Sequence, residues 1–253
     1  MKRKRPEIRR KIDDVLAERI AQIKMEHPFW GYRRVWASLR YRDGIPCNLK
    51  RIYRIMKERN LLCAKKMRPK TADRHHRPKP KAEKPNQIWG TDMTKVFVEG
   101  DGWTYITVVL DWYTKKIVGL KSGRRSKSID WLEALDRALN TQFPEGARGK
   151  GLKLVSDNGC QPTSEAYMRY CSKVDVEQIY TSYNNPKGNA ETERFMRTMK
   201  EELLWLKEWR SSEELSKELQ SWVLKYNSDY LHSTLKYRSP NEMEKHYYKC
   251  EAA

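Results

Sequence analysis

Three carboxylates lie where separate secondary-structure elements could bring them to one site. Asp92 lies in a β-rich run (WGTDMT), although aspartate is depleted in strands. Asp157 follows a short apolar run (LVSDNG), and Glu193 lies near the start of an amphipathic segment (NAETERFMRTMK). Three such groups at one sheet edge would repel one another, and divalent cations would relieve that repulsion. Two hard cations held by carboxylates suit phosphoryl transfer, because one activates the attacking oxygen and the other stabilises the leaving oxygen.

Two of these carboxylates, Asp157 and Glu193, also have an ordinary structural explanation. Asp157 can be the first residue of a D-N-G turn, and Glu193 can be a favourable charge in the first turn of its helix. On that helix Glu193, Arg197 and Lys200 share one face, which allows either an i,i+4 ion pair between Glu193 and Arg197 or two phosphate contacts. The core-facing side is expected to carry four apolar residues: Phe195, Met199, Leu203 and Leu206.

The chain from residue 86 onward predicts strands and helices that could position these carboxylates. Aromatic and β-branched residues predict strands over 87–98, 103–110, 116–120, 152–156 and 176–180. Apolar residues at helical spacing predict helices over 129–139, 163–173, 189–207 and 212–227. Three strands in a meander, followed by alternating helices and strands, are typical of an α/β domain.

The first 63 residues predict a small all-helical domain. Helices are expected over 7–26 and 31–39, and a third helix is expected after Asn48 as its N-cap. Opposite its apolar side, the third helix carries four basic residues: Lys50, Arg51, Arg54 and Lys57. A basic final helix favours a helix-turn-helix that enters the DNA major groove. The alternative is a small bundle with an ordinary solvated face.

Positive charge is concentrated in the first third of the chain. The net charge is +19, and residues 1–85 contain 27 basic and 9 acidic residues, whereas residues 86–253 contain 25 and 24. A polyanion partner explains this asymmetry, because each neutralised phosphate releases counterions. An anionic membrane surface is the competing explanation, but the required apolar helix face is poor. Residues 64–85, with four prolines, are expected to form an extended basic linker.

Length and cysteine content exclude several classes of protein. A chain of 253 residues with 38% hydrophobic residues can bury the core of one large domain or two small ones. No apolar run of 18 residues predicts a membrane span, and no secretory signal is expected. The five cysteines form no CxxC pair, so we expect neither a disulfide scaffold nor a zinc site, and the chain fits a reducing compartment.

Five motifs follow one another along the chain in a recognisable order. They cover residues 27–61 (HPFWGYRRVW and onward), 86–96 (NQIWGTDMTKV), 154–164 (LVSDNGCQPTS), 184–203 (NNPKGNAETERFMRTMKEEL) and 226–244 (YNSDYLHSTLKYRSPNEME). Thirty-five residues separate Asp157 from Glu193, a DD(35)E spacing. In these features the chain resembles the integrase-type transposases of the insertion-sequence-three family, OrfB type, and more distantly the retroviral integrases.

The resemblance implies a fold and a domain organisation. The expected fold class is α/β, an RNase H-like catalytic domain with a mixed five-stranded sheet flanked by helices, preceded by a small all-α helix-turn-helix domain. The expected boundaries are 1–63 for the basic helix-turn-helix-like domain, 64–85 for the linker, 86–210 for the catalytic core and 211–253 for a C-terminal helical extension.

The resemblance also implies an activity and its residues. Asp92, Asp157 and Glu193 are expected to be catalytic and to bind Mg²⁺ or Mn²⁺, with two ions at the site. The expected reactions are cleavage at the ends of an insertion sequence and strand transfer of the 3′-hydroxyl to a phosphodiester. No covalent protein–DNA intermediate is expected. DNA contacts are expected from Arg33, Arg34, Lys50, Arg51, Arg54, Lys57, Asn158, Lys187, Asn189, Arg197 and Lys200.

Partners follow from the same resemblance. We expect double-stranded DNA as element ends and as target, a homo-oligomer of at least two subunits, OrfA as a fusion or partner, no membrane, and a cytoplasmic, nucleoid-associated location in bacteria. Two other functions stay open: a metal-dependent nuclease of RNase H-like fold that only hydrolyses, and a catalytically inactive DNA-binding regulator. A joined product made from a 3′-hydroxyl donor would distinguish a transposase from the nuclease. Metal-dependent nicking would distinguish a transposase from the inactive regulator.

Overall fold

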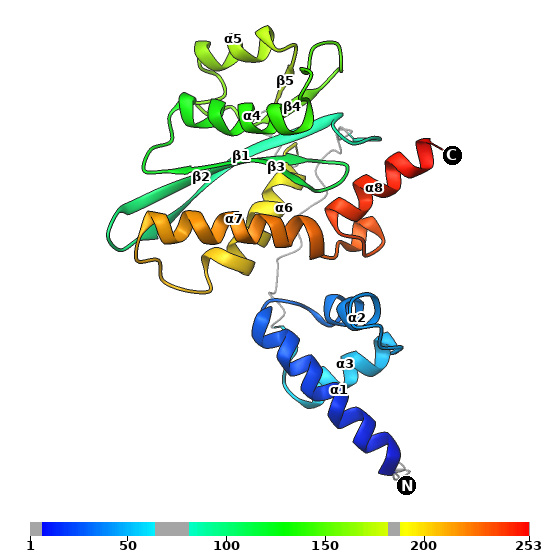
Figure 1. The fold of residues 1–253 in the computed structure, drawn as a ribbon. Helices are drawn as coiled ribbons and strands as arrows, with labels where there is room; N and C mark the ends of the chain where they lie inside the picture. Colours follow the sequence, from blue (N-terminus) through cyan, green and yellow to red (C-terminus); the bar gives the residue numbers. More distant parts are fainter. Residues whose placement is uncertain (1–6, 64–80, 182–187, 253) are drawn as a thin grey trace, which may run out of the picture. The chain divides into compact units, whose positions relative to one another are not determined.

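The computed structural model describes residues 7–63, 81–181 and 188–252 (Figure 1). The chain divides into two units: unit 1 comprises Met1–His75 with Leu231–Tyr237, and unit 2 comprises His76–Tyr230 with Arg238–Ala253. Most of the predicted linker, residues 64–80, lies outside the described residues. Within the described ranges, no helix combines the length and the apolar character needed to cross a membrane.

Unit 1 contains the three predicted helices. They are α1 (Glu7–Glu26), α2 (Tyr32–Tyr41) and α3 (Leu49–Glu58). Asn48 caps α3 as predicted, because its Oδ1 accepts a hydrogen bond of 2.8 Å from the backbone N–H of Lys50. The helices share a small apolar core that includes Ile20, Val35, Leu39, Ile52 and Met56. The described part of the first 63 residues therefore forms the predicted all-helical unit.

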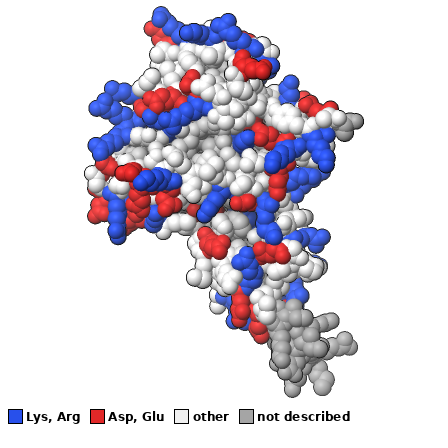
Figure 2. Space-filling view, viewed as in Figure 1, with Lys and Arg blue, Asp and Glu red and all other residues white. Residues whose placement is uncertain are grey.

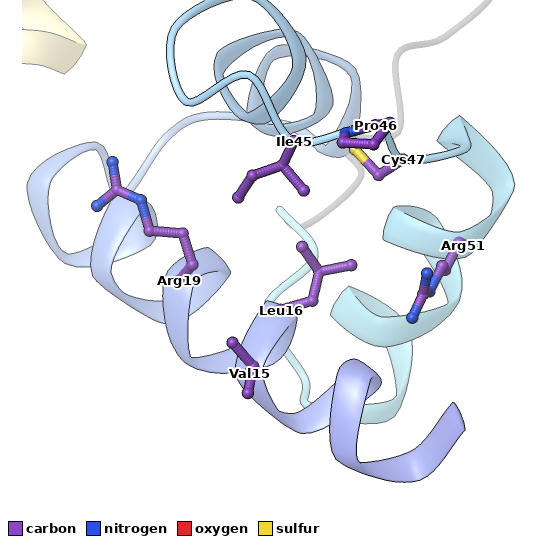
Figure 3. Close-up of a pocket in the computed structure, with 7 residues that line it drawn as sticks. All are labelled: Val15, Leu16, Arg19, Ile45, Pro46, Cys47 and Arg51. Carbon is purple, nitrogen blue, oxygen red and sulfur yellow. The ribbon is translucent and has the colours of Figure 1, made fainter. Parts of the chain in front are cut away.

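A cavity of about 480 Å³ lies between α1 and the chain that leads into α3 (Figure 3). Its lining residues are Val15, Leu16, Arg19, Ile45, Pro46, Cys47 and Arg51. Both arginines already bind carboxylates, Arg19 to Asp43 and Arg51 to Asp13, with closest N···O distances of 2.7 Å. These ion pairs tie α1 to the rest of the unit.

Unit 2 is built on a mixed five-stranded sheet, as predicted. Its strands are β1 (Ile88–Val98), β2 (Gly102–Asp111), β3 (Ile117–Gly123), β4 (Lys153–Ser156) and β5 (Glu177–Tyr180). The strand order is β3-β2-β1-β4-β5. The first three strands pair antiparallel, whereas β4 runs parallel to both β1 and β5. The carboxyl ends of β1 and β4 therefore point to the same side of the sheet.

Helices cover both faces of this sheet. Helices α4 (Ser128–Gln142) and α5 (Glu165–Lys173) lie on one face, and α6 (Ala190–Met199) and α7 (Ser212–Asp229) lie on the other (Figure 1). The core under α4 and α5 is large and apolar, and includes Trp89, Val109, Trp131, Leu135, Leu154 and Tyr167. This packing makes the sheet a rigid base for side chains at its edge.

One detail of the predicted elements is wrong, and one helix was not predicted individually. The helix predicted over 189–207 changes at Lys200 into a π-helical turn, Lys200–Leu204, and Leu206 is 42% exposed instead of facing the core. The wider π turn breaks the 3.6-residue spacing on which that prediction rested. The C-terminal extension also contains a separate helix, α8 (Pro240–Glu251), which Ser239 and Glu242 begin with a capping box.

Candidate active site

The register of β1 and β4 places Asp92 and Asp157 at equivalent positions. Gly90 on β1 pairs with Val155 on β4, and this is the last pair between the two parallel strands. Asp92 and Asp157 each lie two residues beyond it in the same direction. Asp92 within β1 and Asp157 just after β4 therefore lie side by side in sequence register, where these two neighbouring strands stop pairing.

The charge of the third carboxylate, Glu193, also acts on Asp92. The pKa of Asp92 is raised from 3.8 to about 6, mainly by burial and in part by the charges of Asp157 and Glu193. A backbone hydrogen bond of 2.7 Å from the N–H of Met93 and the positive charge of Lys200 act in the opposite direction. Asp92 therefore faces two other negative charges, one from the end of β4 and one from α6.

The other two carboxylates are exposed. Asp157 Oδ1 accepts a 3.1 Å hydrogen bond from the N–H of Gly159, and neither Asp157 nor Glu193 forms an ion pair within the part of the chain that the structure describes. Arg197 binds Glu201 at 2.8 Å, so the ion pair considered between Arg197 and Glu193 is not formed. In the described ranges, no three His, Cys, Asp or Glu side chains are grouped closely enough to hold a metal ion.

A close contact between α6 and β1 sets the position of Glu193. Thr192, the residue before Glu193, is fully buried and its Oγ1 accepts a 3.0 Å hydrogen bond from Nε1 of Trp112. Both atoms lie directly over Gly90, where an added Cβ would meet Thr192 Oγ1 at 2.0 Å and Trp112 Nε1 at 2.2 Å. Only glycine at position 90 lets the helix approach the strand this closely.

Asn189 makes a second connection between α6 and β1. Its Nδ2 donates a 3.1 Å hydrogen bond to the carbonyl of Thr91, the neighbour of Asp92, and the backbone carbonyl of Asn189 accepts from the N–H of Glu193 at 3.0 Å. The Asn189 side chain is only 5% exposed. This burial gives Asn189 a role in positioning α6 and does not support its predicted contact with DNA.

The other DNA-contact candidates of unit 2 have different surroundings. Asn158 donates a 2.8 Å hydrogen bond from Nδ2 to the carbonyl of Thr181, which ties the end of β4 to the end of β5. Lys200 is half-buried near Asp92 and forms no ion pair among the described residues. Lys187 lies outside the described residues.

The candidates of unit 1 fall into three groups. Arg51 and Arg54 both bind the largely buried Asp13 of α1, at 2.7 and 3.2 Å, so their charges already have a partner. Lys50 and Lys57 are exposed and form no ion pair within the described part of the chain. The remaining two lie beside aromatic rings on or next to α2: Arg33 beside Tyr32 and Arg34 beside Trp30.

Sequence reasoning missed the residues that support the carboxylates. Gly90, Trp112 and Thr192 carry no charge and no metal-ligand chemistry, so a search for catalytic residues passes over them. A glycine in the interior of a strand does signal that another chain segment approaches closely. That signal was present at Gly90 but could not identify the partner helix.

Family comparisons agree with this architecture. An HTH-like domain model matches residues 11–70, and two integrase core domain models match residues 82–186 and 174–240. The two core models together span more than half of the chain. The boundary between the HTH-like match and the core matches falls within the predicted linker.

Two proteins of Escherichia coli are similar to this chain in sequence. The chain is 28% identical to the 48.2 kDa protein of insertion element IS2A of Escherichia coli, over 92% of this chain and 56% of that protein. It is also 28% identical to the Escherichia coli transposase InsD of insertion element IS2, over 90% of this chain and 77% of that protein. The chain thus spans little more than half the length of the first relative.

A chain in the simian T-cell lymphotropic virus intasome, solved in complex with the PP2A regulatory subunit B56 gamma, shares the fold. The TM-score is 0.53 with 16% identity, over 82% of this chain and 73% of that chain. Fold, motif order and matched models agree with the resemblance expected from the sequence. The chain therefore belongs to the integrase core family and is a relative of the insertion-sequence transposases that its motifs resemble.

Proposed function

We propose that this protein is a DNA transposase that cleaves the ends of an insertion sequence and joins the freed 3′-hydroxyl to another phosphodiester. Asp92, Asp157 and Glu193 are its proposed catalytic residues. The observation that carries this proposal is the environment of Asp92, whose pKa is raised by burial and by the charges of the other two carboxylates. The transposase names of the Escherichia coli relatives support the same reaction class.

The donor set fits divalent cations. Three carboxylates without an ion-pair partner among the described residues supply hard oxygen ligands, which Mg²⁺ and Mn²⁺ prefer. The cost of holding Asp92 charged beside two negative neighbours disappears when cations neutralise them. We therefore propose that the three carboxylates hold two Mg²⁺ or Mn²⁺ ions and draw together when they do so.

The two proposed reactions, cleavage and joining, use different nucleophiles at the same site. Bound divalent cations would supply activation of the attacking oxygen and stabilisation of the leaving oxygen, with water attacking in cleavage and DNA attacking in joining. Asp92 anchors the site on the rigid sheet, while Thr192 and Asn189 fix the helix that presents Glu193. Lys200, whose charge acts on Asp92, is proposed to bind a phosphate of the reacting strand.

The rest of the chain is proposed to hold DNA. Lys50 and Lys57 of α3, with Arg33, Arg34, Arg51 and Arg54, are proposed to face the DNA backbone or groove, and the boundaries 1–63, 64–85, 86–210 and 211–253 are proposed as functional domains. Synapsis of two DNA ends requires at least a dimer. OrfA is proposed as a fusion or partner, which is compatible with the greater length of the 48.2 kDa relative.

The proposal is tested by a nicking assay on supercoiled DNA with a titration of Mg²⁺ or Mn²⁺. We expect metal-dependent nicking, lost by a factor of at least about 10³ in Asp92→Asn, Asp157→Asn and Glu193→Gln, because each change removes a ligand from the catalytic ions. Lys150→Gln, an exposed residue before β4, is the control. Nicking that survives in any of the three variants removes that residue from the site, and DNA binding without nicking favours a regulator.

A further inference from the structure

The loop between β3 and α4 presents basic side chains that no role described so far uses. Residues 124–127 read Arg-Arg-Ser-Lys, and Arg124, Arg125 and Lys127 are exposed. Arg124 binds Asp101 in the turn between β1 and β2. Arg125 and Lys127 form no ion pair with any residue that the structure describes. Two cations therefore stay available on this loop.

The loop is held from two sides at Ser126. Trp131, a buried residue of α4, donates a 3.2 Å hydrogen bond from Nε1 to the hydroxyl of Ser126. Gln161, which follows β4, donates a 3.0 Å hydrogen bond from Nε2 to the Ser126 carbonyl. The middle of the loop is thereby fixed, so little ordering entropy opposes binding at its two cations.

The second of these bonds connects the loop to the candidate active site. Gln161 and Asp157 both border Gly159, where an added Cβ would meet Asp157 Oδ1 at 3.0 Å and Gln161 Oε1 at 3.3 Å. The side chain that holds Ser126 therefore lies beside the carboxylate proposed to bind metal. Through Gln161, the backbone of residues 124–127 is therefore connected to the surroundings of Asp157.

We propose that the Arg124–Lys127 loop is a binding site for the DNA backbone, with Arg125 and Lys127 donating to phosphate oxygens near the scissile bond. Guanidinium and ammonium groups bind phosphate through charge-assisted hydrogen bonds and carry no sequence information by themselves. Gln161 is the positioning residue that keeps the loop beside Asp157. This inference rests on the proposed function, because it assumes that DNA occupies the site.

The test compares the double variant Arg125→Gln/Lys127→Gln with Lys150→Gln in the full chain. Lys150 is equally exposed but precedes β4, at the opposite end of the strand from Asp157. We expect the double variant to lower the slope of log K against log salt, for a duplex of arbitrary sequence, by about 0.9 for each lost phosphate contact. The control keeps the wild-type slope. An unchanged slope in the double variant overturns the proposal.

Kinetic measurements distinguish a role of the loop in binding DNA from a role in catalysis. They also test the loop site independently of the proposed function. We expect KM for DNA to rise about tenfold in the double variant while kcat stays within about twofold, since a backbone contact formed equally in ground and transition states changes binding only. Varying donor and target duplexes separately in the joining reaction identifies the duplex that the loop binds. Wild-type nicking together with an unaltered KM in the variant overturns the loop site and leaves the proposed function standing. A wild-type chain that binds DNA without nicking, with a reduced slope in the variant, supports the loop and rejects the function.

Discussion

Asp92 and Asp111 are two aspartates of the same sheet with opposite roles. Burial raises the pKa of each. Asp111 accepts three hydrogen bonds of 2.7 Å, from the N–H and hydroxyl of Thr114 and from the N–H of Asn86. Asp92 accepts one bond from Met93 and faces two negative charges. The first carboxylate stabilises a turn, whereas the second destabilises the fold at a position proposed to be catalytic.

This difference predicts opposite effects of one substitution on stability. Without divalent metal at pH 7, Asp92→Asn is expected to raise Tm and Asp111→Asn to lower it by several degrees. A pKa displaced from 3.8 to about 6 corresponds to roughly 3 kcal/mol at most, because Asp92 keeps some solvent contact. In Asp111→Asn the side-chain NH₂ group would face hydrogen-bond donors that Asp111 now accepts from, at a cost of about 1–3 kcal/mol in stability.

The pH dependence follows from the sign of the shift at Asp92. Because its pKa is higher in the folded than in the unfolded protein, folding binds a proton between pH 4 and about 6 and the wild type loses stability as pH rises through this window. The advantage of Asp92→Asn should therefore shrink toward pH 4. Thermal melts in EDTA at pH 4, 5, 6 and 7 measure it, and an advantage that is constant over this range contradicts the explanation.

At the level of helices and strands, the contact between α6 and β1 sets the position of Glu193 relative to Asp92. Gly90, Trp112 and Thr192 allow the close approach, and Asn189 adds a hydrogen bond to Thr91. The proposed site thus depends on uncharged residues as well as on its proposed ligands. A small displacement of α6 would move Glu193 away from Asp92 without unfolding the sheet.

Gly90→Ala is expected to reduce nicking by at least about 10²-fold. The added Cβ would collide with Thr192 Oγ1 and Trp112 Nε1 and push α6 outward, at a cost of about 1–3 kcal/mol in stability. Gly123→Ala is the matched control, because its nearest neighbours would lie 4.0 Å from the new Cβ. Activity and Tm of both variants check this prediction. Equal activity in the two variants would show that the close approach does not position Glu193.

The elements themselves were largely predictable from the sequence, because they depend on local patterns. The helix of unit 1 from 7 to 26, the N-cap Asn48 and all five strands follow from spacing and residue type. The π-helical turn at Lys200 was not predictable, because the apolar spacing before it is that of an ordinary helix. The residues that contact Asp13 and Gly90 could not be predicted either, because both contacts join segments far apart in sequence.

Net positive charge is distributed unevenly along the whole chain. Figure 2 shows basic and acidic side chains intermingled over the sheet-containing unit, in agreement with the 25 basic and 24 acidic residues after position 85. The excess of positive charge lies before that position. Affinity for DNA is therefore expected to come mainly from the first third of the chain, and chemistry from the rest.

The basic residues of α3 should accordingly separate into two classes. Lys50→Gln/Lys57→Gln is expected to lower the salt slope of DNA binding by up to about 2 with little change in Tm, because both side chains are exposed and lack ion-pair partners among the described residues. Arg51→Gln is expected to lower Tm, because it weakens the ion pairing of Asp13. Salt titrations and melts of the three proteins make the comparison, and an unchanged slope in the lysine variant places α3 away from DNA.

A strand-transfer assay tests the central claim most directly. It uses labelled candidate DNA ends with a free 3′-hydroxyl, taken from the DNA that flanks the gene, a target duplex, and either Mg²⁺ or EDTA, with Asp157→Asn as the matched inactive protein. The account predicts joined product with the wild type and Mg²⁺ and none with EDTA or with the variant. Cleavage without joining would contradict it and make the protein a nuclease, and joining that persists in Asp157→Asn would remove the carboxylate site from the reaction.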